Sequence, residues 1–296
     1  MRLHAWLFTF AFGIVVTACG DLLVAQTDST ATRETTAAAD SAPDTLASPV
    51  HTTEAQDSFL PGFVPFGEGE KLVFAVQYGI ITAGEATLEI RNISDIDGTP
   101  CYNIVSNART NDVFSAFFKV RDRFVSLMDT TELVSLRYEK HLREGKFKRD
   151  EVATFDQKEH KAIYDEKVVR IAPRTQDILS SMYYVRTLPL SVGKVISLAT
   201  HSNGKNYPLA VKVLREEKVT VDAGTFDCLV VEPFLEGAGL FNQKGRLTVW
   251  VTNDKYRIPV LMKTQVFIGA VSAVLKSYRL AYKLNHDEQV RSSGSE

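Results

Sequence analysis

The sequence is poor in cysteine and histidine, and this excludes several classes of protein. Its 296 residues include three cysteines and six histidines. Three cysteines are too few for a small disulfide scaffold, and they lack the C-x-x-C spacing of a zinc site. The histidines are scattered, without an H-E-x-x-H pattern. We therefore expect no metal site.

The chain also lacks an excess of one charge and lacks the common nucleotide-binding motifs. Its 34 Lys and Arg residues face 36 Asp and Glu residues, which gives a net charge of −2. A dedicated nucleic-acid binder would carry a strong basic excess, so no nucleic-acid partner is expected. Neither G-x-x-x-x-G-K-[ST] nor a strand-linked G-x-G-x-x-G occurs, and Ser180-Ser181 lacks the G-x-S-x-G elbow. We expect no cofactor, and we expect that the protein is not an enzyme.

Long apolar runs are missing except at the N-terminus, where a short one indicates export. Residues 3–16 are largely apolar and follow Arg2, as in a secretory signal, and the run is too short to span a bilayer. Residues 16–19 read VTAC and resemble the bacterial lipobox. In proteins with that signal, cleavage falls before the cysteine, which then carries acyl chains. The resemblance implies a signal peptide at residues 1–18 and lipidation of Cys19; the alternative is an ordinary signal peptide with a chance cysteine.

The lipobox resemblance also implies a location. Acyl chains on Cys19 would hold the protein on a membrane of the bacterial cell envelope, with the folded domain in the periplasm. In enteric bacteria, an acidic residue directly after the cysteine favours the inner membrane, and here Gly20 stands in that place. This favours the outer membrane over the inner.

Two segments of the chain have the composition of unfolded polypeptide. Residues 19–58 are small, polar and weakly acidic, with little apolar area to offset the entropy of ordering. They are predicted to form a disordered acidic tether, with a glycosylated stalk as the alternative. Residues 285–296 are predicted to be a frayed polar tail. A single domain is predicted between them, over residues 59–284.

In this domain the hydrophobic pattern alternates with period two, which is typical of strands that are buried on one face. Leu72, Phe74 and Val76 lie on one face of the first strand, and residues 86–90 and 101–106 continue the pattern. Further strands are predicted at 119–129, 133–142, 146–155, 160–171, 193–202, 205–216, 217–222, 225–235, 245–252, 257–268 and 271–282.

One helix interrupts the strands. Asp177 is a suitable N-cap for a helix over residues 178–186. The loops between successive strands are short, and helix–strand units do not alternate. The sequence therefore predicts a mostly β fold: an antiparallel up-and-down meander that forms a closed or partly open barrel or curved sheet, with one covering helix.

Four segments resemble a bacterial envelope family known as domain of unknown function 3108. They are residues 69–80 with GEKL and YGI, residues 177–186 with DILS and YVR, residues 221–228 (VDAGTFDC), and residues 250–260 with WVTND and RIPV. The resemblance covers residues 66–282. It implies an exported, mostly β protein, and it supplies neither an established activity nor catalytic residues.

Two cysteines remain after Cys19. Cys101 and Cys228 are on an early and a late predicted strand, and a disulfide between them is possible in an oxidising envelope. The alternative is that both are small buried side chains without a bond between them.

Polar residues offer two further candidates. Asp122 shares a strand face with Val120 and Phe124, so it is either part of an internal ion pair or a polar anchor inside a ligand cavity. A hairpin tip is rich in cations, which are either merely solvated or in contact with anionic headgroups or lipopolysaccharide phosphates. The cations in question are Lys140, Arg143, Lys146, Lys148 and Arg149.

An up-and-down sheet with one helix can enclose a cavity, which suggests a function. We expect a lipid-anchored envelope protein that binds or handles an apolar or lipid ligand in this cavity. The alternative is a non-catalytic scaffold or protein-interaction module that binds another envelope protein. Candidate residues at the cavity mouth are Phe114, Phe117, Phe118, Leu240 and Phe241.

Overall fold

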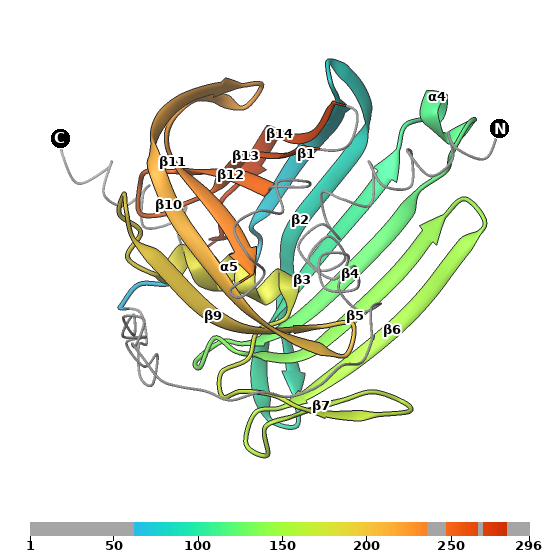
Figure 1. Cartoon of the computed structure of the whole chain (residues 1–296), viewed down its shortest axis with the longest axis vertical. Coiled ribbons are helices and arrows are strands. Elements are labelled where there is room, and N and C mark those ends of the chain that lie inside the picture. The colour runs from blue at the N-terminus through green and yellow to red at the C-terminus, as the bar shows by residue number, and fades with distance from the viewer. Residues whose placement is uncertain (1–61, 236–246, 266–268, 283–296) are drawn as a thin grey trace, which may run out of the picture.

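A computed structural model describes residues 62–235, 247–265 and 269–282, and its fourteen strands form one antiparallel sheet (Figure 1). The two helices in this part are α4 (Asp112–Ser115) and α5 (Ile178–Thr187). The strands are β1 (Lys71–Tyr78), β2 (Ile81–Ile96), β3 (Thr99–Thr110), β4 (Arg121–Asp129), β5 (Ser135–Glu144), β6 (Phe147–Asp156), β7 (Lys161–Ile163), β8 (Val168–Arg170), β9 (Val195–Ser202), β10 (Lys205–Val221), β11 (Gly224–Leu235), β12 (Leu247–Thr252), β13 (Pro259–Gln265) and β14 (Ala270–Arg279). The predicted signal peptide, tether and tail, with Cys19, Leu240 and Phe241, lie outside the described residues.

The sheet is a barrel that is open at one place. Its strand order is β8-β7-β6-β5-β4-β3-β2-β1-β14-β13-β12-β11-β10-β9, so each pair of neighbours is consecutive in the chain except β1 and β14. The first and last strands pair from Lys71 opposite Arg279 to Tyr78 opposite Val271, as in a closed meander. Because β8 and β9 are the two ends of the sheet, the barrel is open between them. The predicted mostly β, antiparallel and partly open architecture is confirmed.

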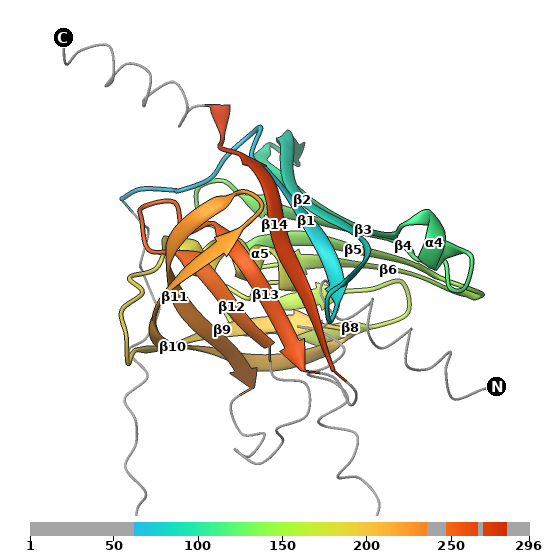
Figure 2. The same ribbon diagram turned by 90° about the horizontal axis from the view of Figure 1, so that it is seen from above.

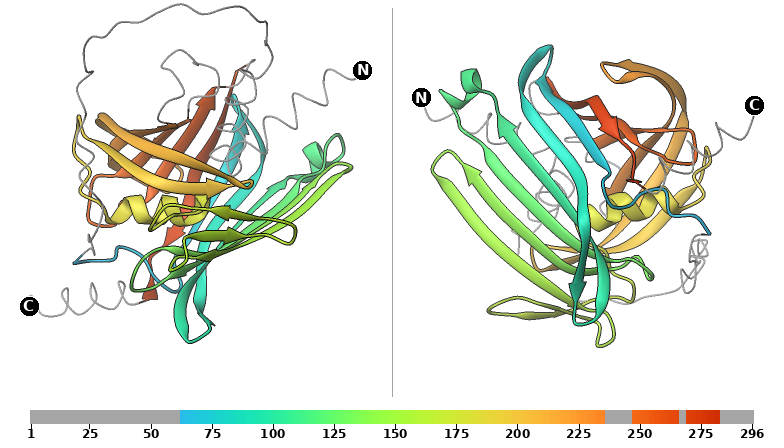
Figure 3. Two further views of the ribbon diagram at one scale, coloured as in Figure 1. Left: turned by 60° about the horizontal axis from the view of Figure 1, so that its bottom comes forward. Right: turned by 180° about the vertical axis from the view of Figure 1, so that it is seen from behind.

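Helix α5 connects β8 to β9 and lies inside the curve of the sheet. Figures 2 and 3 show strands on both sides of it, with β9–β13 on one side and β3–β6 on the other. Eight of its ten residues are buried, as expected for a helix that is enclosed on most of its circumference. The predicted covering helix is therefore present, and it covers the concave side of the sheet.

The N-terminus of α5 is fixed to the sheet by a buried carboxylate. Asp177 is its N-cap, and its Oδ1 accepts hydrogen bonds from the backbone N–H groups of Leu179 (2.7 Å) and Ser180 (3.0 Å). Its Oδ2 accepts hydrogen bonds from the hydroxyls of Ser126 in β4 (2.6 Å) and Ser135 in β5 (2.5 Å). Burial raises the pKa of this carboxyl, and the four hydrogen bonds partly offset the cost of burying its charged form. The predicted cap is confirmed.

The C-terminal turn of α5 is fixed by a buried ion pair. Arg186 donates to both carboxylate oxygens of Glu70, over 2.7 and 2.8 Å, and both side chains are buried. Glu70 directly precedes β1, and the Arg186 Nε donates to the carbonyl of Tyr256 (3.2 Å). The guanidinium also lies over the rings of Phe66 and Tyr183. One side chain therefore joins the helix to the strand at which the two halves of the sheet meet.

Side chains bridge the opening between the two ends of the sheet. Gly204 N–H donates to the Tyr164 hydroxyl (3.0 Å), and that hydroxyl is 2.8 Å from His201 Nε2. His201 Nδ1 is 2.6 Å from Asn206 Oδ1, so a neutral imidazole with its proton on Nδ1 satisfies every partner. Burial lowers the pKa of His201, which favours this form. The β9–β10 hairpin is thereby tied to the loop between β7 and β8 without a strand ladder.

The observed strands differ from the predicted ones at two places. Residues 160–171 form the two short strands β7 and β8 instead of one, and residues 205–221 form one long strand instead of two. A bulge between Val213 and Arg215 of β10 shifts the register with β11, so the side chains beyond it alternate between the two faces of the sheet in the opposite phase. The distal part of the β10–β11 hairpin consequently makes a second small core, which comprises Val219, Cys228, Val230, Trp250 and Val260.

Removal of the Glu70 charge should strongly destabilise the fold. In Glu70→Gln, the Arg186 guanidinium stays buried without its counter-charge, and such a change lowers the free energy of unfolding by about 3–5 kcal/mol. Urea denaturation measures this loss. The control is Glu217→Gln, which removes the partner of Arg215 in an exposed pair (2.5 Å) and should change stability by about 0–1 kcal/mol. Equal losses in the two variants would contradict the role of the buried pair.

Candidate functional site

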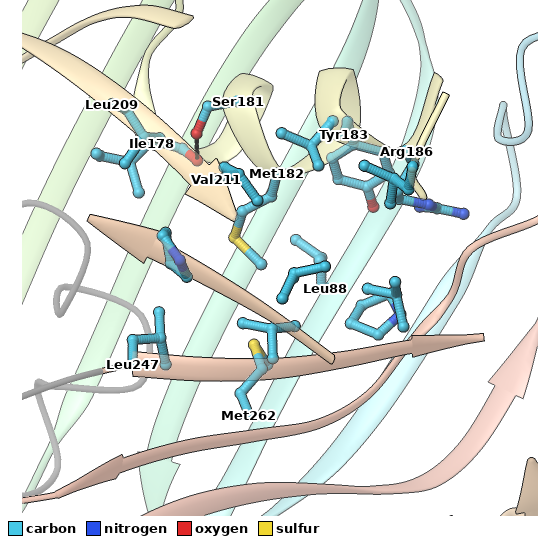
Figure 4. Close-up of a pocket in the computed structure, with 17 residues that line it drawn as sticks. Leu88, Ile178, Ser181, Met182, Tyr183, Arg186, Leu209, Val211, Leu247 and Met262 are labelled. Carbon is cyan, nitrogen blue, oxygen red and sulfur yellow. Dashed lines mark hydrogen bonds between the residues drawn. The ribbon is translucent and has the colours of Figure 1, made fainter. Parts of the chain in front are cut away.

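An apolar pocket lies between α5 and the concave face of β10–β13 (Figure 4). It encloses a cavity of about 80 Å³, several times the roughly 10–15 Å³ that one water molecule needs. Ile178, Met182 and Val185 of α5 line one side. The lining from the sheet comprises Leu88, Leu209, Val211, Val231, Pro233, Leu247, Val249, Val251, Pro259 and Met262.

The pocket lining follows from the periodicity of the two kinds of element. Leu247, Val249 and Val251 of β12 are two residues apart, so all three side chains are on the same face of the sheet. Ile178 and Met182 are four residues apart and are therefore on one face of the helix. Two apolar faces thus oppose each other across a space that their side chains do not fill.

Two polar side chains in the pocket wall have partners within the protein, whereas the buried Tyr183 hydroxyl has no hydrogen-bond partner among the described residues. Ser181 donates its hydroxyl hydrogen to the carbonyl of Ile178 (2.8 Å), and Arg186 is paired with Glu70. Burial, together with the nearby Glu70 carboxylate, raises the pKa of Tyr183, so this phenol stays neutral. The described residues of the pocket wall therefore present a largely apolar surface without an unpaired charge, which suits an apolar ligand.

Asp122 is buried as predicted, but it does not line this pocket. Its Oδ1 accepts a hydrogen bond from the backbone N–H of Arg143 (2.8 Å), and its carboxyl also hydrogen-bonds to the carboxyl of Glu144. Two carboxyls can share such a bond only if one of them is protonated. Burial raises the pKa of Asp122 to about 6, against these hydrogen bonds. Asp122 is thus part of an internal acid pair between β4 and β5 and is not an anchor in the apolar pocket.

The predicted basic hairpin is only partly a free surface. Lys140 is buried, donates to the side-chain oxygen of Asn203, and lies 4.0 Å from Glu151. It cannot contact a headgroup from this position, because its side chain points inward.

Two other cations of this hairpin are neutralised at the surface. Arg143 pairs with Asp150 (2.8 Å), and Arg149 pairs with Glu151 (2.6 Å). Among the described residues, the members of the predicted set that are exposed and have no ion-pair partner are Lys146 and Lys148.

Three of the predicted mouth residues, Phe114, Phe117 and Phe118, do not border the apolar pocket. Phe114 and Phe118 are partly buried and pack against the main core, while Phe117 is 81% exposed. All three belong to the segment around α4, which does not contribute to the pocket lining. The aromatic cluster was correctly placed between strands, but sequence alone did not show which side of the sheet it would occupy.

Cys101 and Cys228 are free thiols, so the suggested disulfide is not formed. Cys101 is in β3 and Cys228 is in β11, and the strands β2, β1, β14, β13 and β12 lie between them in the sheet. Both thiols are buried, and burial raises the pKa of each to about 11. The second alternative, two small buried side chains, is the one that the structure supports.

A second depression, of about 460 Å³, lies on the outer face of the sheet. Its lining is polar and of mixed charge, including Arg109, Arg121 and Lys276 together with Glu85 and Asp222. Arg109 pairs with Glu85 (3.0 Å), and Lys276 lies 3.9 Å from the same carboxylate. These groups largely satisfy one another, so this depression is a weaker candidate for a ligand site than the apolar pocket.

The described part of the chain shows neither a metal-binding cluster nor a membrane-spanning helix. Its His, Cys, Asp and Glu side chains form no group of three or more that could hold a metal ion. Neither α4 nor α5 is long and apolar enough to cross a bilayer.

The sequence matches the family described as "Protein of unknown function (DUF3108)" over residues 73–276. The chain belongs to this family. No curated protein matches it. The family description gives no activity that could be transferred to this chain.

Solved structures of similar shape share little sequence with this DUF3108 chain. A β-barrel-like protein of domain-of-unknown-function family 1849 from Brucella abortus has 11% identity and a TM-score of 0.48, with 72% of this chain and 98% of that chain covered. A protein of family 1089 from Pseudomonas aeruginosa has 9% identity and a TM-score of 0.38, with 62% and 90% covered.

Sequence reasoning predicted a cavity in this DUF3108 domain, but it missed the residues that line the pocket and the buried ion pair. A signal for the pair was present, because Glu70 and Arg186 both stand in segments that resemble the family. An acidic residue next to a glycine turn is ordinarily solvated, so Glu70 gives no local sign of burial. Gly69 has a φ of +87°, and a Cβ atom on this residue would lie only 2.5 Å from the ring of Tyr282. This close packing explains the glycine and the burial of its neighbour.

The Asp122 carboxyl should make stability depend on pH. Because its pKa rises from 3.8 to about 6 on folding, the folded state binds more protons than the unfolded state between about pH 4 and 6. The free energy of unfolding should therefore fall by about 3 kcal/mol as pH rises through this range. In Asp122→Asn, the neutral amide can accept from Arg143 N–H and donate to Glu144, so this decline should disappear.

Urea denaturation of both proteins from pH 4 to pH 8 measures the difference. The control is Asp150→Asn, which removes an exposed carboxylate whose pKa is lowered by His141 and Arg143, and which should leave the decline in place. A decline that persists in Asp122→Asn would disprove the assignment.

The two buried thiols should be protected in the native protein and should both react after unfolding. Iodoacetamide added without reductant should leave Cys101 and Cys228 unmodified in buffer, because they are buried and protonated. In concentrated urea, mass spectrometry of peptides should find both alkylated. Recovery of a Cys101–Cys228 disulfide peptide would contradict the structure.

Proposed function

We propose that this protein is a lipid-anchored component of the bacterial cell envelope, and that its β domain binds the end of an acyl chain. The observation that carries the proposal is the apolar pocket between α5 and β10–β13. The membrane anchor would be the acylated Cys19, after removal of residues 1–18. The domain would lie in the periplasm, and the outer membrane is favoured over the inner.

The size and chemistry of the pocket support an acyl chain over other ligands. A cavity of about 80 Å³ has room for a short run of methylene groups and is too small for a whole lipid with its headgroup. Each methylene that is transferred from water into it would contribute about 0.8 kcal/mol, so four would contribute about 3 kcal/mol. Among the described lining residues, no charge is left unpaired, so a polar ligand group that loses its water here would find no charged partner in return.

The position of α5 supports the same proposal. The helix is fixed at both ends by buried carboxylates, Asp177 and Glu70, while its middle, around Met182, faces the cavity. Methionine is unbranched and adapts to the shape of its neighbours, so it suits the wall of a site for a flexible chain. A ligand could therefore be accommodated by side chains without displacement of the helix.

The proposal predicts saturable binding of an acyl probe that depends on the pocket. The full chain, stripped of lipid in detergent, should bind 11-(dansylamino)undecanoic acid with an increase in dansyl fluorescence. Val249→Trp places an indole in the cavity, and it should weaken binding at least tenfold because the space is filled. Lipid extracted from protein purified without stripping should contain acyl chains by mass spectrometry.

The matched control is Val192→Trp, which adds the same indole at an exposed position outside the pocket (52% exposed) and should bind the probe normally. Urea denaturation of both variants establishes that each is folded. The proposal fails if the unsubstituted protein shows no saturable binding, or if folded Val249→Trp binds as well as the control.

A further inference from the structure

Three tips at one end of the sheet expose large apolar side chains. The exposed fractions are 97% for Ile80 and 56% for Ile81 in the β1–β2 hairpin. They are 69% for Val113 and 81% for Phe117 around α4, and 51% for Phe147 in the β5–β6 hairpin. We call these five residues the apolar rim. Isolated exposed apolar residues are ordinary, but five on neighbouring tips indicate a contact surface.

The three tips are adjacent in space. The backbone N–H of Asn111 donates to Ala83 O (3.0 Å), and its side chain donates to Thr82 O (2.8 Å), which joins the α4 segment to the β1–β2 hairpin. On the other side, Gly145 N–H donates to Lys119 O (2.8 Å). Figure 1 shows these tips along the upper right of the molecule, with α4 between the two hairpins.

Packing as well as hydrogen bonding holds the α4 segment against the β5–β6 hairpin. Gly145 has a φ of +58°, and a Cβ on it would lie 2.9 Å from the ring of Phe118. Phe114 and Phe118 are partly buried and pack against the core, whereas Phe117 between them is exposed. The segment is therefore fixed by two phenylalanines while it presents the third to solvent.

Exposed lysines flank the apolar rim on two of its three tips, the α4 segment and the β5–β6 hairpin. Lys119, Lys146 and Lys148 are exposed on the same tips, and the exposed acidic residue beside them is Asp112. The neighbouring Asp150 is paired with Arg143, so its charge is largely neutralised. This arrangement is complementary to an anionic bilayer surface. The apolar side chains can enter the acyl region, while the lysines beside them meet the phosphates that lie just outside it.

We propose that the apolar rim docks the domain on the surface of an anionic phospholipid bilayer. The five apolar side chains enter the boundary between headgroups and acyl chains, and the three lysines contact headgroup phosphates. The side chains project singly from narrow tips, which suits a fluid surface better than the flat, closely packed face of a protein partner. This contact is independent of the acyl-chain pocket and of Cys19, and it gives the domain a fixed orientation on the membrane.

Fluorescent labels at the two ends of the sheet test this orientation. The full chain is reconstituted with vesicles of phosphatidylethanolamine and phosphatidylglycerol, after an NBD label is attached at Ala116→Cys, next to Phe117. A second protein carries the label at Thr131→Cys, in the turn between β4 and β5 at the other end of the strands. Cys101 and Cys228 are buried and should not react with the label.

The proposal predicts a blue-shifted emission and protection from iodide for the Ala116→Cys label, and an aqueous emission with full quenching for the Thr131→Cys label. An anchor on Cys19 alone would hold the domain near the membrane without this difference. Phosphatidylcholine vesicles should reduce the docked fraction, because they carry no net charge. Equal emission from the two labels on the anionic vesicles would overturn the proposal.

Substitutions in the labelled Ala116→Cys protein identify the side chains responsible. Ile80→Ser with Phe117→Ser should lower the ratio of docked to undocked protein at least tenfold, and each of Lys146→Gln and Lys148→Gln should lower it about fivefold. The control, Val168→Ser with Val192→Ser, changes two exposed apolar residues outside the rim (60% and 52%) and should have no effect. All these positions are exposed, so folding should be unchanged in urea denaturation. An unchanged ratio in the Ile80→Ser, Phe117→Ser protein would also overturn the proposal.

Discussion

The ion pair between Arg186 and Glu70 joins helix α5 to strand β1, and the rest of the structure is arranged around these two elements. Arg186 is in the last turn of the helix inside the barrel, and Glu70 directly precedes β1, whose pairing with β14 joins the two halves of the sheet. Two charges buried together are tolerated because the contact is bidentate and the Tyr256 carbonyl accepts a further hydrogen bond. With Asp177 at its other end, α5 is held at both termini by polar contacts, and its apolar middle is available to line a cavity.

The place of the opening follows from this helix. In an up-and-down barrel every consecutive pair of strands can form a ladder, but the connection from β8 to β9 contains α5 and passes through the interior. The two strands are therefore kept apart, and the contact between their ends is made by the neutral His201, the Tyr164 hydroxyl and the Gly204 backbone. The interior consequently contains both a helix and the apolar pocket beside it, so an open barrel can still enclose a ligand.

The two proposals place different functions on different parts of the sheet. The pocket lies against β10–β13, in the half that follows α5, whereas the apolar rim is carried by the hairpins of β1–β6, in the half that precedes it. Rim docking would fix the domain at a lipid surface from which an acyl chain could come. The Asp122–Glu144 acid pair lies beside the β5–β6 hairpin and holds β4 to β5 just below the rim.

The sequence by itself determined the local structure. Alternating apolar residues specified the strands, Asp177 specified the start of the helix, and the ordered motifs identified the family, because all of these are short-range patterns. The tertiary structure decided what depends on contacts between distant segments: the insertion of α5, the pairing of Glu70 with Arg186 across 116 positions, and the separation of Cys101 from Cys228 by five strands. It also decided which of the cations and phenylalanines reach the surface. Period-two alternation gives two faces for each strand, but only the closure of the sheet determines which face is inside and which tips lie side by side.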